Sequence, residues 1–313
     1  TLKIWNKEAV LGDVVWAIRN FKPDVIINRF DHRSPGSTHG HHTSSAMLSV
    51  EAFDLANNTN SYPEQLKLTG TWQPKRMFFN TSWWFYGSEE KFEKADKSNM
   101  LNLDIGTYYP ILGVSNNEIA ALASSQHLCQ GFGRLSQRGT ENEYIELLKG
   151  ELPKDKNNVF DGIDTSWSRI AGGEAIGAIL YDIENKFNFK NPSKHLPQLL
   201  EAYSLLQNIS DKHWKKLKSE ELKNLIVNIT GLYLEASAET AETNPGDTVK
   251  VTIEAVNRSD ANIVLQSVLI PSSDAVLDSS TPLKTNEKHT FELTLKVPVD
   301  AEYQKMAHSV GFC

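Results

Sequence analysis

The segment that decides the fold is PDVIINRFDHRSPGSTHGHHTSSAMLSVEAFDLAN, residues 23–57. It opens with the continuous apolar run VIIN (25–28), which is typical of a strand buried in a parallel sheet. The polar run 29–40 is rich in turn-forming residues and predicts a loop. Residues 41–57 then space their apolar side chains as an α-helix does. A buried strand, a loop and a helix in this order predict an α/β unit. The helix side chains available for burial are Ala46, Met47, Val50, Phe53 and Leu55.

The flanking sequence continues this alternation. Residues 8–21 place apolar side chains at helical spacing, and Pro23 ends that helix. RMFFN (76–80) predicts a second strand, and residues 116–128 predict a further helix. Strands that alternate with helices predict a parallel sheet covered by helices. The apolar positions of the first helix are Val10, Leu11, Val14, Val15, Ile18 and Phe21.

The pattern changes twice further along the chain. Residues 141–229 have the pattern of a mostly helical, charged region that completes or flanks an α/β domain of residues 1–140. From residue 230 to 313, short segments alternate apolar and polar residues with period two, and turn formers separate them. This pattern predicts an immunoglobulin-like β-sandwich with its boundary near Ile229. The predicted fold class is therefore α/β, followed by a helical middle region and a C-terminal sandwich.

The composition excludes several classes of protein. The chain has 313 residues and a formal net charge of −7, which argues against a nucleic-acid partner held by phosphate neutralisation. No apolar run reaches the roughly 18 residues that a membrane-spanning helix needs, so the sequence predicts no transmembrane segment. Cys129 and Cys313 are the only cysteines, which excludes a disulfide framework and a cysteine-rich zinc site.

Three of the nine histidines stand together at the start of the helix predicted for 41–57. They are His39, His41 and His42, in the string THGHHTSSA. Ligands of open α/β sheets bind outside the carboxyl ends of the strands, and this cluster follows the strand VIIN. Neutral imidazole is also a common protein ligand of zinc. The residues alone leave two interpretations open, a metal or ligand site and a set of solvated surface histidines. The nearest acidic residue is Asp31, eight positions before His39.

Four segments, taken in their order along the chain, resemble those of one enzyme family. PDVIINRF, HGHHTSSA, WQPKRMFFN and HLCQGFG are similar to segments of the LmbE-like, or PIG-L, zinc-dependent N-deacetylases, in particular the large secreted bacterial members. The resemblance covers residues 1 to about 135 and extends weakly beyond. It implies a Rossmann-like α/β fold, of which this chain would hold a part. It also implies zinc-dependent removal of N-acetyl groups from N-acetylglucosamine-type glycoconjugates.

The family carries two metal motifs, and this chain matches one of them. The resemblance gives His42 the position of the zinc-ligating histidine, and His39 the position of the histidine near the developing oxyanion. Gly40 and His41 stand where the family has Pro and Asp, which puts the supporting role of that Asp in question. No segment of the 313 residues resembles the family's HPDDE motif, which supplies a zinc His, a zinc Asp and the Asp general base.

Further candidate residues follow the predicted strand or belong to HLCQ. The HLCQ string resembles a family element that lines the active site, which makes His127 and Gln130 candidate substrate contacts, with Cys129 in place of Ser. Arg29 and His32 are candidate contacts to a sugar hydroxyl or a phosphate. The alternatives are a core position for His127, a solvated loop for Arg29 and His32, and a buried position without catalytic role for Cys129.

An aromatic cluster, TSWWFYG, occupies residues 81–87. Such rings can stack on sugars, and they also fill the seams between domains. The sequence favours the second interpretation, in which the rings are packed rather than exposed.

The ends of the chain predict an internal piece of a longer protein, because it begins at Thr1 without a signal peptide and ends on AHSVGFC after a β-rich stretch. A processed mature N-terminus is the alternative. We expect an intact protein in which His42 and an HPDDE-type segment hold zinc, and in which these 313 residues alone are inactive. The resemblance favours export to the periplasm or cell surface. The rival hypotheses are a non-catalytic carbohydrate-binding protein and a surface-interaction protein with solvated histidines.

Overall fold

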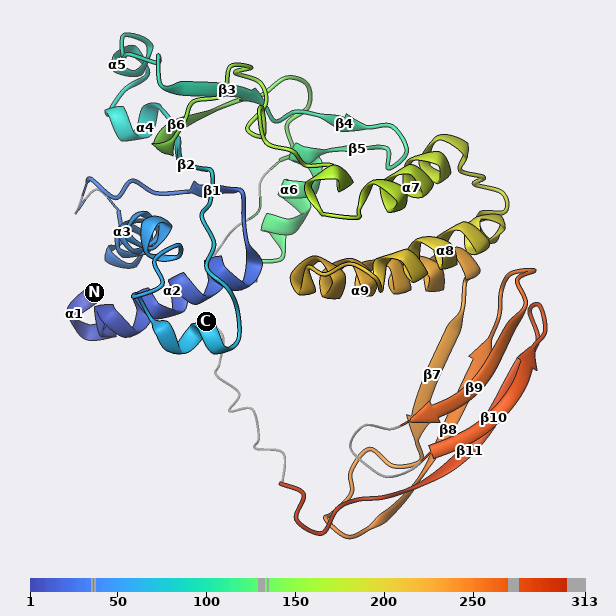
Figure 1. Cartoon of the computed structure of the whole chain (residues 1–313). Coiled ribbons are helices and arrows are strands. Elements are labelled where there is room, and N and C mark those ends of the chain that lie inside the picture. Colours follow the sequence, from blue (N-terminus) through green and yellow to red (C-terminus); the bar gives the residue numbers. More distant parts are fainter. Residues whose placement is uncertain (35, 37, 129–132, 134, 270–275, 303–313) are drawn as a thin grey trace. The chain divides into compact units, whose positions relative to one another are not determined.

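The described chain forms two compact units, the first from Thr1 to Asp164 and the second from Thr165 onward. Helices and strands alternate in the first unit, whereas the second has helices followed by antiparallel strands (Figure 1). The predicted order of an α/β region, a helical middle and a β-rich C-terminal part is confirmed at this level. The structure is a computed structural model, and it describes all residues except 35, 37, 129–132, 134, 270–275 and 303–313.

A four-stranded mixed sheet forms the centre of the first unit, in the order β1-β2-β6-β3. β1 (Val25–Asn28) pairs in parallel with β2 (Arg76–Thr81), as predicted. β6 (Asn142–Gly150) lies between β2 and β3 (Met100–Asp104) and is antiparallel to both. β6 differs from the predictions of a parallel sheet and of a helical region from residue 141. Pairing on both edges outweighs the helix propensity of its Glu, Leu and Lys residues.

Two helices pack together beside β1. α2 (Lys7–Phe21) and α3 (Gly40–Leu55) confirm the two helices predicted around this strand, with bounds close to those expected. Phe21 and Met47 were predicted at apolar positions but are 76% and 41% exposed, because they lie outside the face that the helices share. That shared face is a core cluster of Leu11, Val15, Ile18, Leu48, Ala52 and Ala56.

A buried arginine joins α2 to the chain that leaves α3. The side chain of Arg19 is 0% exposed, and its guanidinium donates hydrogen bonds of 2.8–3.4 Å. Burial lowers the pKa of Arg19, and none of its acceptors is a carboxylate. Carbonyl dipoles therefore compensate for its charge. The acceptors are the backbone carbonyls of Leu55, Ala56, Asn58, Ser61 and Tyr62, and Oε1 of Gln65.

Shorter elements complete the first unit. The helix predicted for residues 116–128 is confirmed as α6 (Asn116–Ser125), which a capping box of Ser115 and Glu118 initiates. The strands contribute a second core cluster of Phe78, Leu101 and Ile145. The remaining elements are α1 (Leu2–Trp5), the 3-10 helix η1 (Pro63–Lys67), α4 (Trp83–Tyr86), α5 (Glu89–Glu93), β4 (Tyr108–Tyr109) and β5 (Val114–Ser115).

The second unit begins with a helical part around one apolar core. α9 starts at the cap residue Asp211, whose carboxylate accepts two backbone N–H bonds, and ends at Gly231 in the left-handed conformation. Among the described helices, none combines the length and the apolar composition needed to cross a membrane. The elements are η3 (Trp167–Arg169), α7 (Glu174–Lys186), η4 (Pro192–His195), α8 (Leu196–Leu206) and α9 (Lys212–Thr230).

Two antiparallel sheets follow, in the orders β11-β8-β7 and β10-β9. β8 shows the predicted alternation most clearly, since Val249, Val251, Ile253 and Ala255 are buried and their neighbours are not. Ser193 donates a hydrogen bond of 2.7 Å to Asp260, which ties the end of η4 to the loop between β8 and β9. The strands are β7 (Tyr233–Ala238), β8 (Thr248–Val256), β9 (Ile263–Leu269), β10 (Val276–Leu283) and β11 (Lys288–Lys296).

Candidate metal centre

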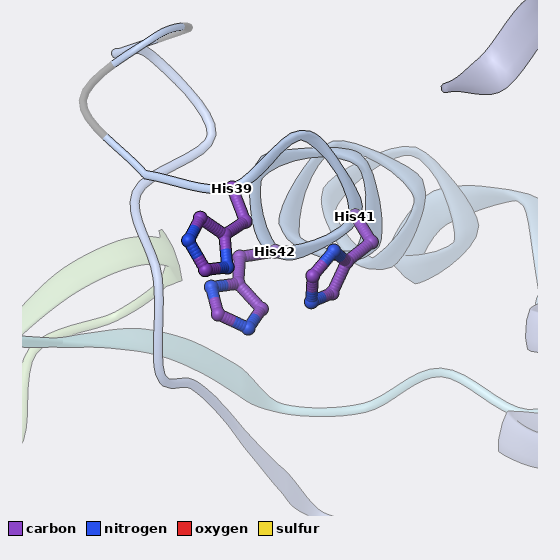
Figure 2. Close-up of side chains that lie close together, drawn as sticks. All are labelled: His39, His41 and His42. Carbon is purple, nitrogen blue, oxygen red and sulfur yellow. The ribbon is translucent and has the colours of Figure 1, made fainter. Parts of the chain in front are cut away.

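The histidine cluster lies at the amino end of α3. His39 is the N-cap residue, with extended backbone angles, and its carbonyl accepts the backbone N–H of His42 at 3.0 Å. His41 lies in the same first turn. Figure 2 shows the three rings together at this end of the helix. The loop after β1 and the first turn of α3 thus bring three imidazoles close together.

The three side chains are close enough to share one metal ion. Their candidate ligand nitrogens all lie within 4.8 Å of one another, and they are the one group of this kind among the described residues. A tetrahedral zinc ion with nitrogens at about 2.0–2.1 Å would hold them about 3.4 Å apart. The rings would therefore have to move closer together to reach that geometry. Neutral imidazoles suit zinc, so the donor set fits the ion that the sequence predicted.

Phe30 packs against His42, the residue predicted to bind zinc. The imidazole of His42 stacks on Phe30, with ring centroids 3.9 Å apart and planes inclined by 8°. His42 stays half-buried, whereas His39 and His41 are exposed. Burial, followed by the neighbouring imidazoles of His41 and His39, lowers the pKa of His42. This ring therefore remains neutral, with a lone pair for a metal, to a lower pH than an ordinary imidazole.

An ionic cluster anchors the loop that leads to the histidines. The guanidinium of Arg33 donates to both carboxylate oxygens of Glu146 on β6, at 2.9 and 2.7 Å, and to Asp31 at 2.8 Å. Ser34 donates to the second oxygen of Asp31 at 2.7 Å. Asp31 is buried, and its carboxylate is fully engaged in these contacts. It is therefore a structural anchor of the loop, and it does not join the histidine group.

The structure brings together only part of the predicted site. His39 and His42 lie side by side with ring centroids 5.3 Å apart, and the guanidinium of Arg29 lies 6.0 Å from the ring of Phe30, on which His42 stacks. Arg29 is exposed and donates a long bond of 3.4 Å to the carbonyl of Asn80. His32 packs near Asp31 instead, with Nδ1 3.7 Å from a carboxylate oxygen.

The remaining predicted contacts follow α6. His127 is exposed and is not a member of the histidine group. Gln130 and Cys129 lie outside the described residues, so the predictions made for them stay predictions.

His41 is the residue whose role the sequence analysis did not identify. The sequence placed it in the histidine cluster but gave it no role as a ligand, yet its ring centroid lies 4.1 Å from that of His42. The signal in the sequence was the occurrence of three histidines within four consecutive positions at the start of a predicted helix. The structure therefore adds His41 to the histidines that could hold a metal ion.

Comparisons of the chain with known proteins find no relative. No family model, no curated protein and no solved structure matches the chain.

The ring of His32 should make the first unit less stable in mild acid. Burial lowers the pKa of His32, and its buried Nδ1 has no hydrogen-bond partner among the described residues. When the pH falls below 6.5, the ordinary pKa of histidine, the unfolded state therefore binds more protons than the folded state. The free energy of unfolding should then decrease with pH until the lowered pKa of His32 is reached. An NMR titration of the ring checks the direction. The His32→Gln variant should show a shallower loss of stability over the same range, and an unchanged slope would contradict this account.

Proposed function

We propose that the first unit belongs to a zinc-dependent hydrolase that removes N-acetyl groups from N-acetylglucosamine-type glycoconjugates. The observation that carries this proposal is the convergence of His39, His41 and His42, with ligand nitrogens within 4.8 Å of one another. Phe30 lies two residues beyond β1 and stacks on His42, so the group belongs to the carboxyl end of that strand. This edge is where open α/β sheets bind their ligands. The sequence resemblance supplies the reaction class.

The proposal gives separate roles to the three histidines and to Arg29. His42, neutral and fixed against Phe30, and His41 hold the metal. His39, at the end of the loop, donates an imidazole N–H toward the acetyl oxygen as negative charge develops there. Arg29 is exposed, with its guanidinium near the ring of Phe30, and binds a hydroxyl of the sugar. Zinc, when bound, supplies Lewis acidity and an activated water.

Binding of zinc is the first test of the proposal. We expect one zinc ion per chain by calorimetry of the metal-free protein, and at least about tenfold weaker binding in the His42→Ala variant, because one imidazole ligand is lost. His41→Ala should weaken binding similarly. His127→Ala is the matched control, since it removes a histidine outside the group. Equal zinc affinity in wild type and His42→Ala would contradict the proposed centre.

Acetate release tests the reaction itself. Nothing in the 313 residues resembles the HPDDE segment that would supply the general base, so we expect zinc binding without acetate release from these residues alone. A longer form of the protein that carries such a segment should release acetate from N-acetylglucosamine conjugates and should lose this activity in His42→Ala. Failure of that form to release acetate while it binds zinc would contradict the hydrolase.

We also infer a finer description of the fold from the same function. The parallel pair β1–β2 with α2 and α3 is compatible with a part of a Rossmann-like domain. The two antiparallel sheets of the second unit are compatible with an immunoglobulin-like accessory module. A glycoconjugate substrate would place such a protein outside the cytoplasm, in the periplasm or at the cell surface.

A further inference from the structure

A second concavity lies at the edge of the sheet where β2 ends. It has a volume of about 380 Å³ and is lined by residues of β2, α4, α5 and the start of β6. β1 and β2 are parallel and β6 is antiparallel to β2, so the carboxyl ends of β1 and β2 and the amino end of β6 meet at this edge. We call it the acidic groove, and its principal residues are Thr81, Trp83, Glu89, Phe92, Glu143 and Tyr144.

The aromatic side of the acidic groove can accept both a sugar ring and a cation. Trp83 is 48% exposed, so its indole is free to stack on a ligand. Phe92 and Tyr144 meet edge to face with ring centroids 5.0 Å apart. The ammonium of Lys97 lies 4.7 Å from the centroid of Phe92 and 6.0 Å from that of Tyr144. These two rings therefore already attract one ammonium group of the protein itself.

The polar side of the groove is negatively charged. Glu89, Glu93 and Glu143 line it. Lys97 lies 3.9 Å from a carboxylate oxygen of Glu93, whereas Glu89 and Glu143 form no ion pair with the described residues. Glu143 is held in place because one of its oxygens accepts a hydrogen bond of 2.7 Å from Asn80. A cationic group in the groove would reduce the repulsion among these carboxylates, and an anionic ligand would increase it.

A buried hydroxyl gives an independent indication that the groove suits a polar ligand. Thr81 lines the same groove and is 1% exposed. Its Oγ1 has no hydrogen-bond partner among the described residues. A buried polar atom without a partner costs free energy, and a ligand hydroxyl or ammonium can remove that cost.

We propose that the acidic groove binds an amino sugar, with the sugar ring stacked on Trp83 and the protonated amino group directed to the carboxylates. This goes beyond the proposed hydrolase, because it assigns a ligand to a site that contains no member of the histidine group. The ligand differs from an N-acetylated sugar by one positive charge, which the aromatic rings and the glutamates both favour. If the hydrolase proposal also holds, the groove retains a unit from which the acetyl group has been removed.

Binding of two matched oligosaccharides tests this proposal. The probes are a short glucosamine oligosaccharide and its fully N-acetylated counterpart, titrated by NMR into the metal-free chain at mildly acidic pH. We expect the amino form to bind and the acetylated form to bind at least about tenfold more weakly. Raised salt should weaken binding of the amino form only. Metal and acetate release play no part, so failure here is distinguishable from failure of the hydrolase.

The variants have close controls in the same short helices. Trp83→Ala should weaken binding of the amino form about three- to fivefold. Trp84→Ala should not, because Trp84 is 50% exposed in the same turn but does not line the groove. Glu89→Gln should weaken binding of the amino form more than Glu90→Gln does, because Glu89 lines the groove and Glu90 does not. Thr81→Val should weaken binding without lowering stability, since it removes an unpartnered hydroxyl.

Two outcomes would overturn the assignment. Equal affinity for the amino and acetylated probes would show that the positive charge of the amino group does not contribute to binding. Equal losses in Trp83→Ala and Trp84→Ala would remove the groove as the binding site.

Discussion

Replacing Arg19 by methionine is expected to lower the free energy of unfolding of the first unit by about 4 kcal/mol. Methionine fills much of the same space but donates no hydrogen bond. The lost guanidinium is 0% exposed and serves five backbone carbonyls and one side-chain oxygen. The carbonyls of the chain that leaves α3 would remain without this donor. Each buried acceptor left unpaired costs about 1–3 kcal/mol, although relaxation and water recover part of the sum.

A lysine at the same position should recover only part of the loss. Its ammonium has three donors at one point, whereas the guanidinium donates in a planar fork from three nitrogens. The acceptors of Arg19 extend from Leu55 to Gln65 along the chain, and one ammonium cannot reach all of them. We therefore expect Arg19→Lys to lie between wild type and Arg19→Met.

Hydrogen exchange measured by mass spectrometry is the suitable assay for these variants, because it reports each unit separately. Peptides from α2 and α3 should lose protection in Arg19→Met, and peptides from the second unit should not. Arg29→Met is the matched control. It removes an exposed arginine with one long hydrogen bond and should change stability by no more than about 0.5 kcal/mol. Similar effects of the two substitutions would contradict the proposed role of Arg19.

Local patterns in the sequence predicted the elements that depend on local interactions. The helical spacing in residues 8–21 and 41–57 predicted α2 and α3, and the apolar runs predicted β1 and β2. Each element needs only one buried face to specify its type. β6 was missed because its residues include strong helix formers, and pairing with β2 and β3 decides its conformation. Contacts that are distant in sequence leave no trace in a short window.

The sequence predicted where the histidine cluster lies in the fold, but it did not identify His41 as a candidate ligand. The strand–loop–helix order placed the cluster at the carboxyl end of β1, and the structure confirms that placement. In the structure His39 precedes the helix in an extended conformation, so its position depends on the loop rather than on helical spacing. His41 lies in the first turn of α3, and its ring centroid is 5.6 Å from that of His39.

The sequence patterns also failed to predict the structural roles of two charged residues. Arg19 and Arg33 have the sequence context of solvated positions, in a helix and in a polar loop. The first is buried against backbone carbonyls, and the second bridges two buried carboxylates. Apart from Asp31, which is two residues from Arg33, their acceptors lie between 36 and 113 residues away, and no periodic pattern reveals contacts at such separations.

Arg33→Met is expected to cost the first unit about 2 kcal/mol. This is less than the 3–5 kcal/mol typical of a fully buried pair, because the Arg33 side chain is 47% exposed and solvent screens it. The loss arises from the carboxylates of Asp31 and Glu146, which are only 9% and 11% exposed and would lose their cation. The loop that ends at His39 would also lose its link to β6, so zinc affinity should fall about threefold even though no ligand is changed.

The pH dependence separates this ionic cluster from the histidines. Burial alone would raise the pKa of Asp31, but hydrogen bonds from Ser34 and Arg33 outweigh it and hold that pKa below its ordinary 3.8. The stabilisation is therefore complete above 3.8 and is lost as the pH falls below that value. Arg33→Met should move acid unfolding of the first unit to higher pH, as followed by hydrogen exchange. Lys94→Met, which removes an exposed ion pair with Glu90, should leave it in place. If both substitutions had the same acid profile as wild type, the Arg33 bridge would not be what holds this loop, and the zinc affinity of Arg33→Met should then equal that of wild type.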